Sequence, residues 1–456
     1  MFKKDFVWGV ATASVQIEGG AKSDGKGPSV WDTFCDRGGV IEGNETPAVS
    51  CDHYHRWAED VEIMAELGIR AYRMSVSWPR LFPEGTGKIN RAGVDFYNRL
   101  FDRCLEKGIE PYVTLYHWDL PQKLSEKGGW LNRDCADWFA EYSAKAAELF
   151  SDRVKQFIPL NEPTCALVLG YAIGVHAPGY RLSRKEANAA AHHMLLAQGK
   201  SVQALRAGAK SKVCIGTATV ANVRTPSDGT KESLEAARAA TFAPEKWAEN
   251  AAWWLDPILL GDYVQQKLPG YEDYFENVRE GDLAIISSPI DYIGLNMYNS
   301  FPVSARAVGS GTGGIYCNEA FKPGYPKTSM GWPVTPEVMY YGPKFYSERY
   351  KGVPIYITEN GVALNEWICS DGKVHDPMRA DYLKRYLRAL ADIADEADVR
   401  GYFYWSLLDN FEWSNGYDKR FGLVYVDYGD CTRTIKDSAW YYKEIIASDG
   451  EILSKV

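Results

Sequence analysis

Apolar positions along this chain follow a helical spacing in some segments and form short continuous runs in others. In residues 57–67 and 94–104, an apolar side chain recurs every three or four positions, which is typical of a helix with one buried face. These side chains are Trp57, Val61, Met64 and Leu67, and then Val94, Tyr97, Phe101 and Cys104. A glycine follows each pattern, and an apolar run rich in β-branched and aromatic residues comes next. The glycine suits the left-handed position after a helix, and the run suits a buried strand.

This helix–glycine–strand unit occurs at three places. The segments read ELGIRAY at 66–72, EKGIEPY at 106–112 and YKGVPIY at 350–356. Such repetition is the signature of parallel α/β folds. The pattern predicts eight strands, at about 6–12, 69–76, 110–116, 155–161, 212–219, 290–296, 354–359 and 400–407. Eight strands with intervening helices predict an α/β fold, a (β/α)8 TIM barrel with long βα loops, whose chemistry lies at the carboxyl ends of the strands.

A doubly wound parallel sheet is the alternative fold for this order of elements. That fold carries a GxGxxG turn after its first strand, and the sequence has none there. The glycine-rich residues 309–314 lack a lysine and follow no clear strand–helix junction, so we interpret them as a flexible loop rather than a phosphate-binding turn. No linker or low-complexity block divides the sequence, and we expect residues 1–456 to form a single barrel domain.

The charge balance narrows the range of partners. Lys and Arg number 51 against 60 Asp and Glu, a formal net charge of −9. Such a surface repels nucleic-acid phosphates and anionic lipid, so we expect no nucleic-acid and no membrane partner. No apolar stretch approaches the roughly 20 residues that a membrane span needs. A homo-oligomer is compatible with this composition.

The N-terminal segment and the cysteines bear on the compartment. Residues 1–15 resemble a signal peptide in having two lysines before an apolar run, but Asp5 and the shortness of the run favour a buried strand. Nine cysteines are scattered along the chain, and the nearest two are 16 positions apart. This spacing excludes a CxxC unit and favours free thiols, from which we predict a cytoplasmic protein.

Two glutamates stand at the ends of predicted strands. Glu162 follows the fourth strand in FIPLNEP, and Glu359 ends the seventh in IYITENG. A capping or salt-bridged role would explain either glutamate alone. Two carboxyls at the active face of one barrel instead suit acetal hydrolysis, in which one protonates the leaving oxygen and the other attacks the anomeric carbon.

The other strand ends carry groups that suit a sugar. Amides, an imidazole, carboxylates and flat rings bind hydroxyls and the apolar face of a sugar ring. The high aromatic content of the chain, 13%, agrees with this interpretation. The residues concerned are Gln16, Glu18, Arg73, Tyr116, His117, Trp118, Asp119, Asn296, Tyr298, Trp405, Asn410, Glu412 and Trp413. A metal is the alternative for His117, Glu162 and Glu359, but no HxxE or HExxH motif supports it, and we predict neither a metal nor a cofactor.

Six motifs occur in order along the chain. They are FVWGVATA (6–13) with Gln16 and Glu18, YRMS (72–75) with WPR (78–80), TLYHWDLP (114–121), NEP (161–163), TENG (358–361) and WSLLDNFEW (405–413). Together they resemble glycoside hydrolase family 1, the retaining β-glucosidase family, over essentially the whole length. Any one triplet would be unspecific, whereas six in order are very specific.

The resemblance implies a role for each matched residue. Glu162 would be the general acid/base and Glu359 the nucleophile. Arg73 would lie beside the nucleophile, and a cis peptide would join Trp405 to Ser406. The implied substrate-binding residues are Gln16, His117, Trp118, Asn161, Asn296, Tyr298, Trp332, Trp405, Glu412, Trp413 and Phe421. Among them, Asn296 and Tyr298 would also surround the nucleophile, Trp332 would lie on the aglycone side and Phe421 would close the site.

The implied activity is hydrolysis of a small-molecule β-glycoside. A terminal nonreducing β-D-glucosyl residue would be released with retention, and galactosyl or fucosyl residues are compatible. Arg73 and Tyr298 would favour the charged form of Glu359, and that charge would raise the pKa of Glu162. A retaining pair of carboxyls lies about 5–5.5 Å apart.

Three alternatives stay open at this stage. A 6-phospho-β-glucosidase shares the fold, but Glu412 would repel the phosphate dianion near the sugar's C4 and C6 oxygens. A thioglucosidase of the same family lacks the acid, which is present here as Glu162. A noncatalytic sugar-binding protein would not need both carboxylates.

Overall fold

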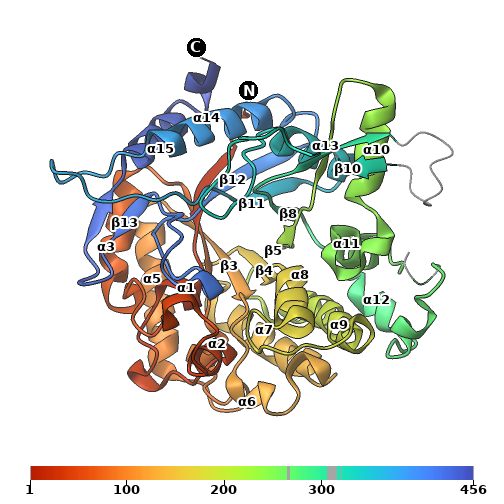
Figure 1. Cartoon of the computed structure of the whole chain (residues 1–456). Helices are drawn as coiled ribbons and strands as arrows, with labels where there is room; N and C mark the ends of the chain where they lie inside the picture. The colour runs from red at the N-terminus through yellow and green to blue at the C-terminus, as the bar shows by residue number, and fades with distance from the viewer. Residues whose placement is uncertain (1, 264–265, 267, 306–315, 319, 455–456) are drawn as a thin grey trace.

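A closed ring of parallel strands forms the centre of the structure (Figure 1). The computed structural model describes residues 2–263, 266, 268–305, 316–318 and 320–454. Neighbouring strands pair in parallel in the order β5-β4-β3-β2-β1-β12-β11-β8-β6, and the short segment that contains both β5 and β6 closes the ring. The strands are β1 (Val7–Ala11), β2 (Ala71–Ser75), β3 (Glu110–Tyr116), β4 (Gln156–Leu160), β5 (Cys214–Ile215), β6 (Thr219–Val220), β8 (Ile293–Asn296), β11 (Ile355–Asn360) and β12 (Val399–Trp405). This ring confirms the predicted (β/α)8 barrel, because a doubly wound sheet stays open.

The fifth barrel position differs from the prediction of one strand over 212–219. There β5 pairs only with β4, and β6 pairs only with β8, so two short strands occupy the position of one barrel strand. Gly216 lies between them, and a Cβ on it would come 2.0 Å from the ring of Tyr292. Close packing of this ring against the backbone separates the two short strands, and the segment still bridges both neighbours.

Helices cover the outside of the ring (Figure 1). The longer ones are α3 (His53–Glu66), α5 (Arg91–Glu106), α7 (Cys135–Phe150), α9 (Arg184–Gly208), α13 (Val338–Arg349), α14 (Pro377–Ala391) and α15 (Asp437–Ala447). The three predicted helix-ending glycines, Gly68, Gly108 and Gly352, have φ values of 70°, 73° and 79°. The left-handed backbone expected after each helix is therefore confirmed.

The predicted N-terminal strand is also confirmed. β1 lies between β2 and β12 in the ring, and Trp8 on it is fully buried. The interior strands are buried on both faces, as the continuous apolar runs indicated. Arg73 on β2 is a charged residue among these apolar positions. It is 1% exposed, and its side chain points into the ring.

Long loops at the carboxyl ends of the strands carry further elements. They hold α1 (Ser14–Ile17), α2 (Val30–Cys35), α4 (Trp78–Leu81), α6 (Gln122–Ser125), α8 (Pro163–Leu167), α10 (Lys231–Thr241), α11 (Ala251–Leu259) and α12 (Asp282–Ile286). They also hold a small sheet of β7 (Arg224–Pro226), β9 (Phe301–Ala305) and β10 (Tyr316–Asn318), and a hairpin of β13 (Val424–Val426) and β14 (Arg433–Ile435). The sequence patterns did not predict these five strands. The glycine-rich residues 309–314 lie outside the described residues.

The eight cysteines whose side chains are described are all free thiols. Within the described ranges, no helix combines the length and the apolarity that crossing a membrane would require.

Candidate active site

A cavity opens at the carboxyl ends of the barrel strands and contains about 650 Å³ of empty space. Its walls come from the ends of five barrel strands and the connections that follow them, namely β3, β4, β8, β11 and β12. The lining residues are His117, Trp118, Asn161, Glu162, Cys165, Leu169, His176, Tyr298, Met330, Trp332, Glu359, Trp405, Glu412, Trp413, Asn415 and Phe421. The structure thus brings both strand-end glutamates into one cavity, together with nine of the predicted substrate-binding residues. We call it the catalytic cavity below.

Glu359, at the end of β11, is held by a donor on each carboxylate oxygen. Arg73 Nη1 donates to Oε1 at 2.6 Å, and the hydroxyl of Tyr298 donates to Oε2 at 2.7 Å. The Glu359 side chain is 5% exposed and the Arg73 side chain 1%, so water screens this ion pair little. Both donors stabilise the ionised form of the carboxyl.

Glu162 has the opposite environment. It caps α8 with a φ of 41°, and its N–H donates to the carbonyl of Ala218 at 2.8 Å. Burial, and after it the negative charge of Glu359, raises the pKa of Glu162 to about 8. Burial is thus the larger of the two causes. Asn296 Nδ2 donates to Glu162 Oε1 at 2.8 Å, so this amide contacts Glu162 rather than Glu359.

A hydrogen-bonded chain links the two carboxyls behind the cavity wall. Arg73 Nη2 donates to Asn161 Oδ1 at 2.6 Å, and Asn296 Nδ2 also lies 3.2 Å from that oxygen. Asn161 Nδ2 in turn lies 3.0 Å from His117 Nε2. Burial and the charge of Arg73 lower the pKa of His117, so the ring is neutral. Its Nε2 accepts from Asn161, which leaves the ring proton on Nδ1.

Gln16 lies behind Glu412 rather than on the cavity wall. Its Nε2 donates to Asn410 Oδ1 and to the carbonyl of Phe411, both at 3.0 Å, and lies 3.5 Å from Glu412 Oε2. Gln16 Oε1 is buried and has no partner among the described residues. Burial, followed by the charges of Glu359 and Glu162, raises the pKa of Glu412 to about 8.

Aromatic rings form two walls of the cavity. His117 lies nearly parallel to Trp405 and to Trp413, with centroids 5.8 and 5.9 Å away, and Trp118 packs on Trp413 at 4.4 Å. On the other side, the ring of Phe421 lies 6.1 Å from those of Tyr298 and Trp332. The Trp405–Ser406 peptide is cis, as expected.

Three non-glycine residues of the cavity have a left-handed backbone. The φ values are 41° at Glu162, 72° at Trp118 and 52° at Trp413. Such conformations cost about 1–3 kcal/mol each and persist where the surrounding structure holds them. Backbone geometry of this kind cannot be read from residue periodicity.

Some strand-end residues have structural partners instead. Glu18 pairs with Arg80 Nε at 2.8 Å and accepts from the hydroxyl of Tyr97, away from the catalytic cavity. Five lining residues were not anticipated, because they lie in the connections beyond the strand ends: Cys165, Leu169, His176, Met330 and Asn415. Only Cys165 had a usable signal, since it lies one helical turn after Glu162 and its N–H donates to the Glu162 carbonyl at 3.0 Å.

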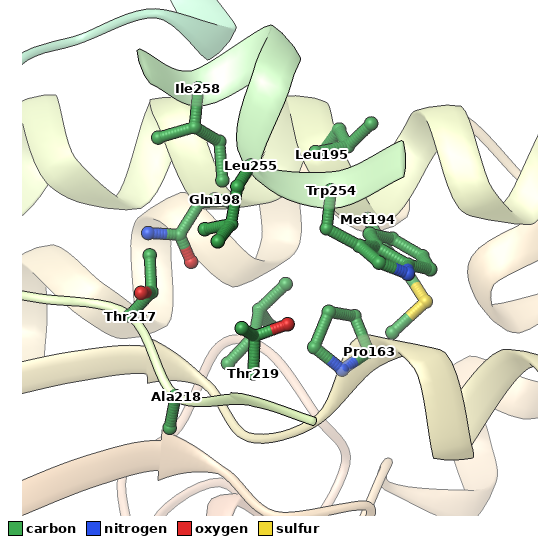
Figure 2. A pocket seen from close by; sticks show the side chains of 11 residues that line it. Pro163, Met194, Leu195, Gln198, Thr217, Ala218, Thr219, Trp254, Leu255 and Ile258 are labelled. Carbon is green, nitrogen blue, oxygen red and sulfur yellow. The ribbon is translucent and has the colours of Figure 1, made fainter. Parts of the chain in front are cut away.

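A second cavity lies between the β5–β6 segment and helices α9 and α11 (Figure 2). It contains about 290 Å³ of empty space, and its eleven described lining residues include no titratable side chain. Leu255, Ile258 and Trp254 make it a mostly apolar gap in the packing. Within the described residues, no group of three or more His, Cys, Asp or Glu side chains is arranged to hold a metal ion. The catalytic cavity, which holds both strand-end glutamates, is the candidate site.

Sequence comparison assigns the chain to a known family. The model of the family described as Glycosyl hydrolase family 1 matches residues 1–451. The chain belongs to glycosyl hydrolase family 1. Members of this family are O-glycosyl hydrolases, which agrees with two carboxyls in one cavity.

Relatives in family 1 match nearly the whole chain. Beta-glucosidase A of Thermotoga maritima is 44% identical over 450 residues, which cover 98% of each chain. A bifunctional beta-D-glucosidase/beta-D-fucosidase of Bifidobacterium breve is 40% identical, again over 98% of each chain. The structure of the Thermotoga maritima beta-glucosidase in complex with glucoimidazole matches with a TM-score of 0.89 and 43% identity, covering 98% of this chain and 99% of that one.

Proposed function

We propose that this family 1 protein is a retaining β-glucosidase, with Glu359 as nucleophile and Glu162 as general acid/base. The observation that carries the proposal is the contrast between two carboxyls in one cavity. Glu359 accepts from Arg73 and Tyr298, whereas burial and the charge of Glu359 raise the pKa of Glu162 to about 8. One group is thus prepared to attack and the other to donate a proton at neutral pH.

In the first step, a Glu359 carboxylate oxygen attacks the anomeric carbon and forms a glycosyl ester. The bond from that carbon to the leaving oxygen breaks, and Glu162 gives its proton to this oxygen. The aglycone leaves as an alcohol or a phenol.

In the second step, Glu162 acts as the base. Formation of the ester removes the negative charge of Glu359, so the pKa of Glu162 falls. Glu162 therefore stays ionised after it has given its proton to the leaving oxygen. Glu162 takes a proton from water, the water oxygen attacks the anomeric carbon, and the ester bond breaks to restore the Glu359 carboxylate. Two inversions at one carbon give retention.

The sugar would be held by the groups around these carboxyls. Trp405 supplies a flat platform for the apolar face of the ring, and the neutral His117 offers its Nδ1 proton to a hydroxyl. Glu412 on the cavity wall would bind a hydroxyl, and Gln16 behind it, with Nε2 3.5 Å from Glu412 Oε2, would orient this carboxyl. The Bifidobacterium breve relative supports a fucosyl residue as a further substrate.

The 6-phospho-β-glucosidase alternative is disfavoured by Glu412. This carboxyl lines the cavity beside Gln16, and no lysine or arginine is among the described lining residues. A phosphate dianion would meet an acidic group without a cation on the same wall. A noncatalytic sugar-binding protein would not require two carboxyls with such different environments as those of Glu162 and Glu359.

The nucleophile is tested by replacing Glu359 with glycine. Glu359→Gly should reduce turnover of 4-nitrophenyl β-D-glucoside below about one part in 10⁴, and azide should restore it by attack from the vacated side. The NMR spectrum of the product should show an α-glucosyl azide. Glu110→Ala, at the amino end of β3, is the matched control and should keep normal activity. A β-azide product, or full activity without azide, would contradict the assignment.

The acid/base is tested through the leaving group. Glu162→Ala should hardly affect the first step with a 2,4-dinitrophenyl glucoside, since that phenolate leaves without a proton. Cellobiose, whose leaving alcohol needs the proton, should lose activity by a factor of about 10²–10⁴. Equal losses on both substrates would assign the proton to another residue.

We also propose that residues 1–456 act as one catalytic domain in the cytoplasm. Pairing of β1 with β12 joins the two halves of the chain in one ring, which supports a single domain. The free thiols, five of them buried, suit a reducing compartment.

A further inference from the structure

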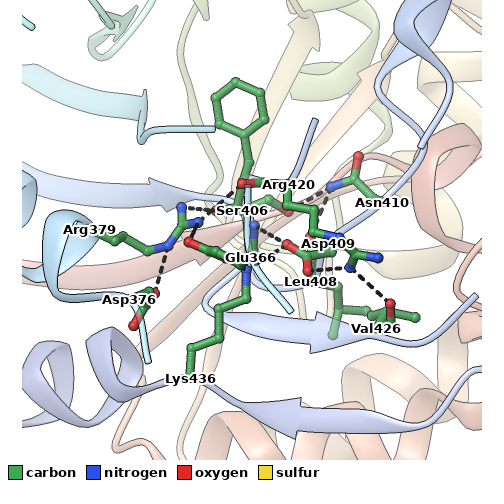
Figure 3. A network of polar contacts seen from close by, with 12 residues as sticks. Glu366, Asp376, Arg379, Ser406, Leu408, Asp409, Asn410, Arg420, Val426 and Lys436 are labelled. Carbon is green, nitrogen blue, oxygen red and sulfur yellow. Dashed lines mark hydrogen bonds and ion pairs between the residues drawn. The ribbon is translucent and has the colours of Figure 1, made fainter. Parts of the chain in front are cut away.

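A series of six charged side chains of alternating sign lies beside the loop that follows β12 (Figure 3). In order of contact they are Asp376, Arg379, Glu366, Lys436, Asp409 and Arg420. Three carboxylates alternate with three cations, so the series is neutral as a whole. We call it the charge series. None of the six belongs to the described lining of the catalytic cavity.

The contacts of the charge series are short, and its side chains are largely buried. Arg379 Nε donates to Asp376 Oδ2 at 2.9 Å, and its Nη2 donates to Glu366. Lys436 Nζ bridges Glu366 and Asp409, the latter at 2.8 Å. Arg420 Nη1 reaches Asp409 Oδ2 at 2.8 Å. Five of the six side chains are 5% exposed or less, and Arg420 is 15% exposed.

Buried ion pairs of this kind are a weak argument for stability alone. Desolvation of each charge offsets much of the attraction, so well-packed apolar side chains would often stabilise a fold as well. A balanced charged series in the interior therefore calls for another role. Its contacts with the main chain indicate what that role is.

Arg379 holds the main chain of the loop directly. Its Nη1 donates to the carbonyl of Phe421 at 3.1 Å, and its Nη2 donates to the carbonyl of Arg420 at 3.1 Å. Nη1 also donates to the carbonyl of Val362, on the loop after β11. The guanidinium of Arg379 thus ties two loops together at the residue whose ring lies at the catalytic cavity.

Asp409 holds the other side of the same loop. Its Oδ1 accepts from the N–H of Gly422 at 2.8 Å, next to Phe421. The next residue, Asn410, accepts from Gln16, and the loop then carries Glu412 and Trp413 into the cavity. Both ends of the substrate-binding part of the loop therefore meet at the charge series.

We propose that the charge series sets the position of residues 410–421, with Arg379 as the positioning residue for Phe421 and, through the loop, for Glu412 and Trp413. This inference rests on the proposed function, because it assigns these side chains to sugar binding. Glu162 belongs to another loop, and the carboxylate of Glu359 is held by Arg73 and Tyr298, which are not part of the charge series. Loss of the Arg379 contacts should therefore weaken sugar binding more than it slows the chemical steps.

The test is Arg379→Lys. Lysine keeps the positive charge between Asp376 and Glu366, but its three donors on one nitrogen cannot reach the spread of acceptors that the planar guanidinium serves. For 4-nitrophenyl β-D-glucoside, KM should rise about 10-fold while kcat stays within about 2-fold. The dissociation constant of glucoimidazole, measured by calorimetry, should rise by a similar factor.

The matched control is Arg349→Lys. Arg349 forms a two-point ion pair with the buried Asp256, at 3.0 and 2.6 Å, between α13 and α11. This variant loses a comparable ion-pair geometry away from the catalytic cavity, and KM should be unchanged. If both variants lower the melting temperature while neither changes KM or glucoimidazole binding, the charge series is only structural and the inference is wrong.

A second variant covers the case in which Arg379→Lys does not fold. Ser438→Ala removes the hydroxyl that donates to Asp376 Oδ2, at the outer end of the series. The main-chain N–H of residue 438, which donates to Asp376 Oδ1, and every charge stay in place. KM should then rise about 2- to 3-fold, and an unchanged KM would also overturn the inference. If the wild-type protein does not hydrolyse β-glucosides, the proposed function fails, whereas a wild-type rate with unchanged variant KM values refutes only the role of the charge series.

Discussion

Glu412 should destabilise the folded protein at alkaline pH, and replacing it with glutamine should remove this effect. Burial, followed by the charges of Glu359 and Glu162, raises the pKa of Glu412 to about 8. Between pH 4.5 and pH 8, the folded state therefore keeps a proton that the unfolded chain releases. Stability is full below the lower pH and falls as the pH rises through this window. Glutamine has no such proton and keeps the shape of the side chain.

The size of the effect follows from the shift. The pKa of Glu412 rises from 4.5 to about 8, which is about 3.5 units, and each unit corresponds to about 1.36 kcal/mol. The loss reaches at most about 5 kcal/mol at pH 8. The entropy of unfolding is about 2.1 cal/mol/K per residue, or about 1 kcal/mol/K for 456 residues. The melting temperature should therefore change by about 5 °C.

The assay is a melting curve for wild type and Glu412→Gln at each half unit from pH 4.5 to 8.5. The melting temperature of the variant minus that of the wild type should increase by about 5 °C as the pH rises from 4.5 to 8.5. Glu232→Gln, an exposed position on α10, is the matched control and should show a constant difference. A difference for Glu412→Gln that stays constant within 1 °C would refute the reasoning, because the proton would not be linked to folding.

Three further predictions use other features of the site. For 4-nitrophenyl β-D-glucoside, kcat/KM should fall above about pH 8 as Glu162 loses its proton; a profile flat to pH 10 would contradict this. Tyr298→Phe removes a charge-assisted hydrogen bond worth about 1.5–3 kcal/mol, so kcat/KM should drop by about 10- to 150-fold in steady-state assays, and a loss below 2-fold would be against it. Gly361→Ala would place a Cβ 1.8 Å from the carbonyl of Trp405, so the melting temperature should fall sharply by calorimetry. Gly229→Ala, with nothing within 4 Å, should melt as the wild type does.

The fold was largely predictable because buried parallel strands leave continuous apolar runs. The exception is residues 214–220, whose two halves pair with different neighbours. That division depends on the Tyr292 ring, which approaches Gly216 only in the folded structure. The small sheet of β7, β9 and β10 was missed since strands of three to five residues are too short for a period to show.

The site was predictable as far as its groups follow strands. Glu359 and His117 could be found in this way, because carboxyl ends of barrel strands meet at one face. The contact of Asn296 with Glu162 could not, since it depends on side-chain direction within the cavity. Arg379 could not be found either, because its acceptors lie far apart in the sequence, on Val362, Tyr404 and Phe421.

The pairing of β1 with β12 has a consequence for biosynthesis. Val7 lies opposite Gly401, so nearly 400 residues must leave the ribosome before the first strand gains its second neighbour. At about 5–20 residues per second, this takes roughly 20–80 seconds. Throughout that interval the nascent polypeptide exposes one bare edge of β1, which can pair with foreign strands. Chaperone demand during translation, rather than after release, should therefore limit the yield of this enzyme in a cell.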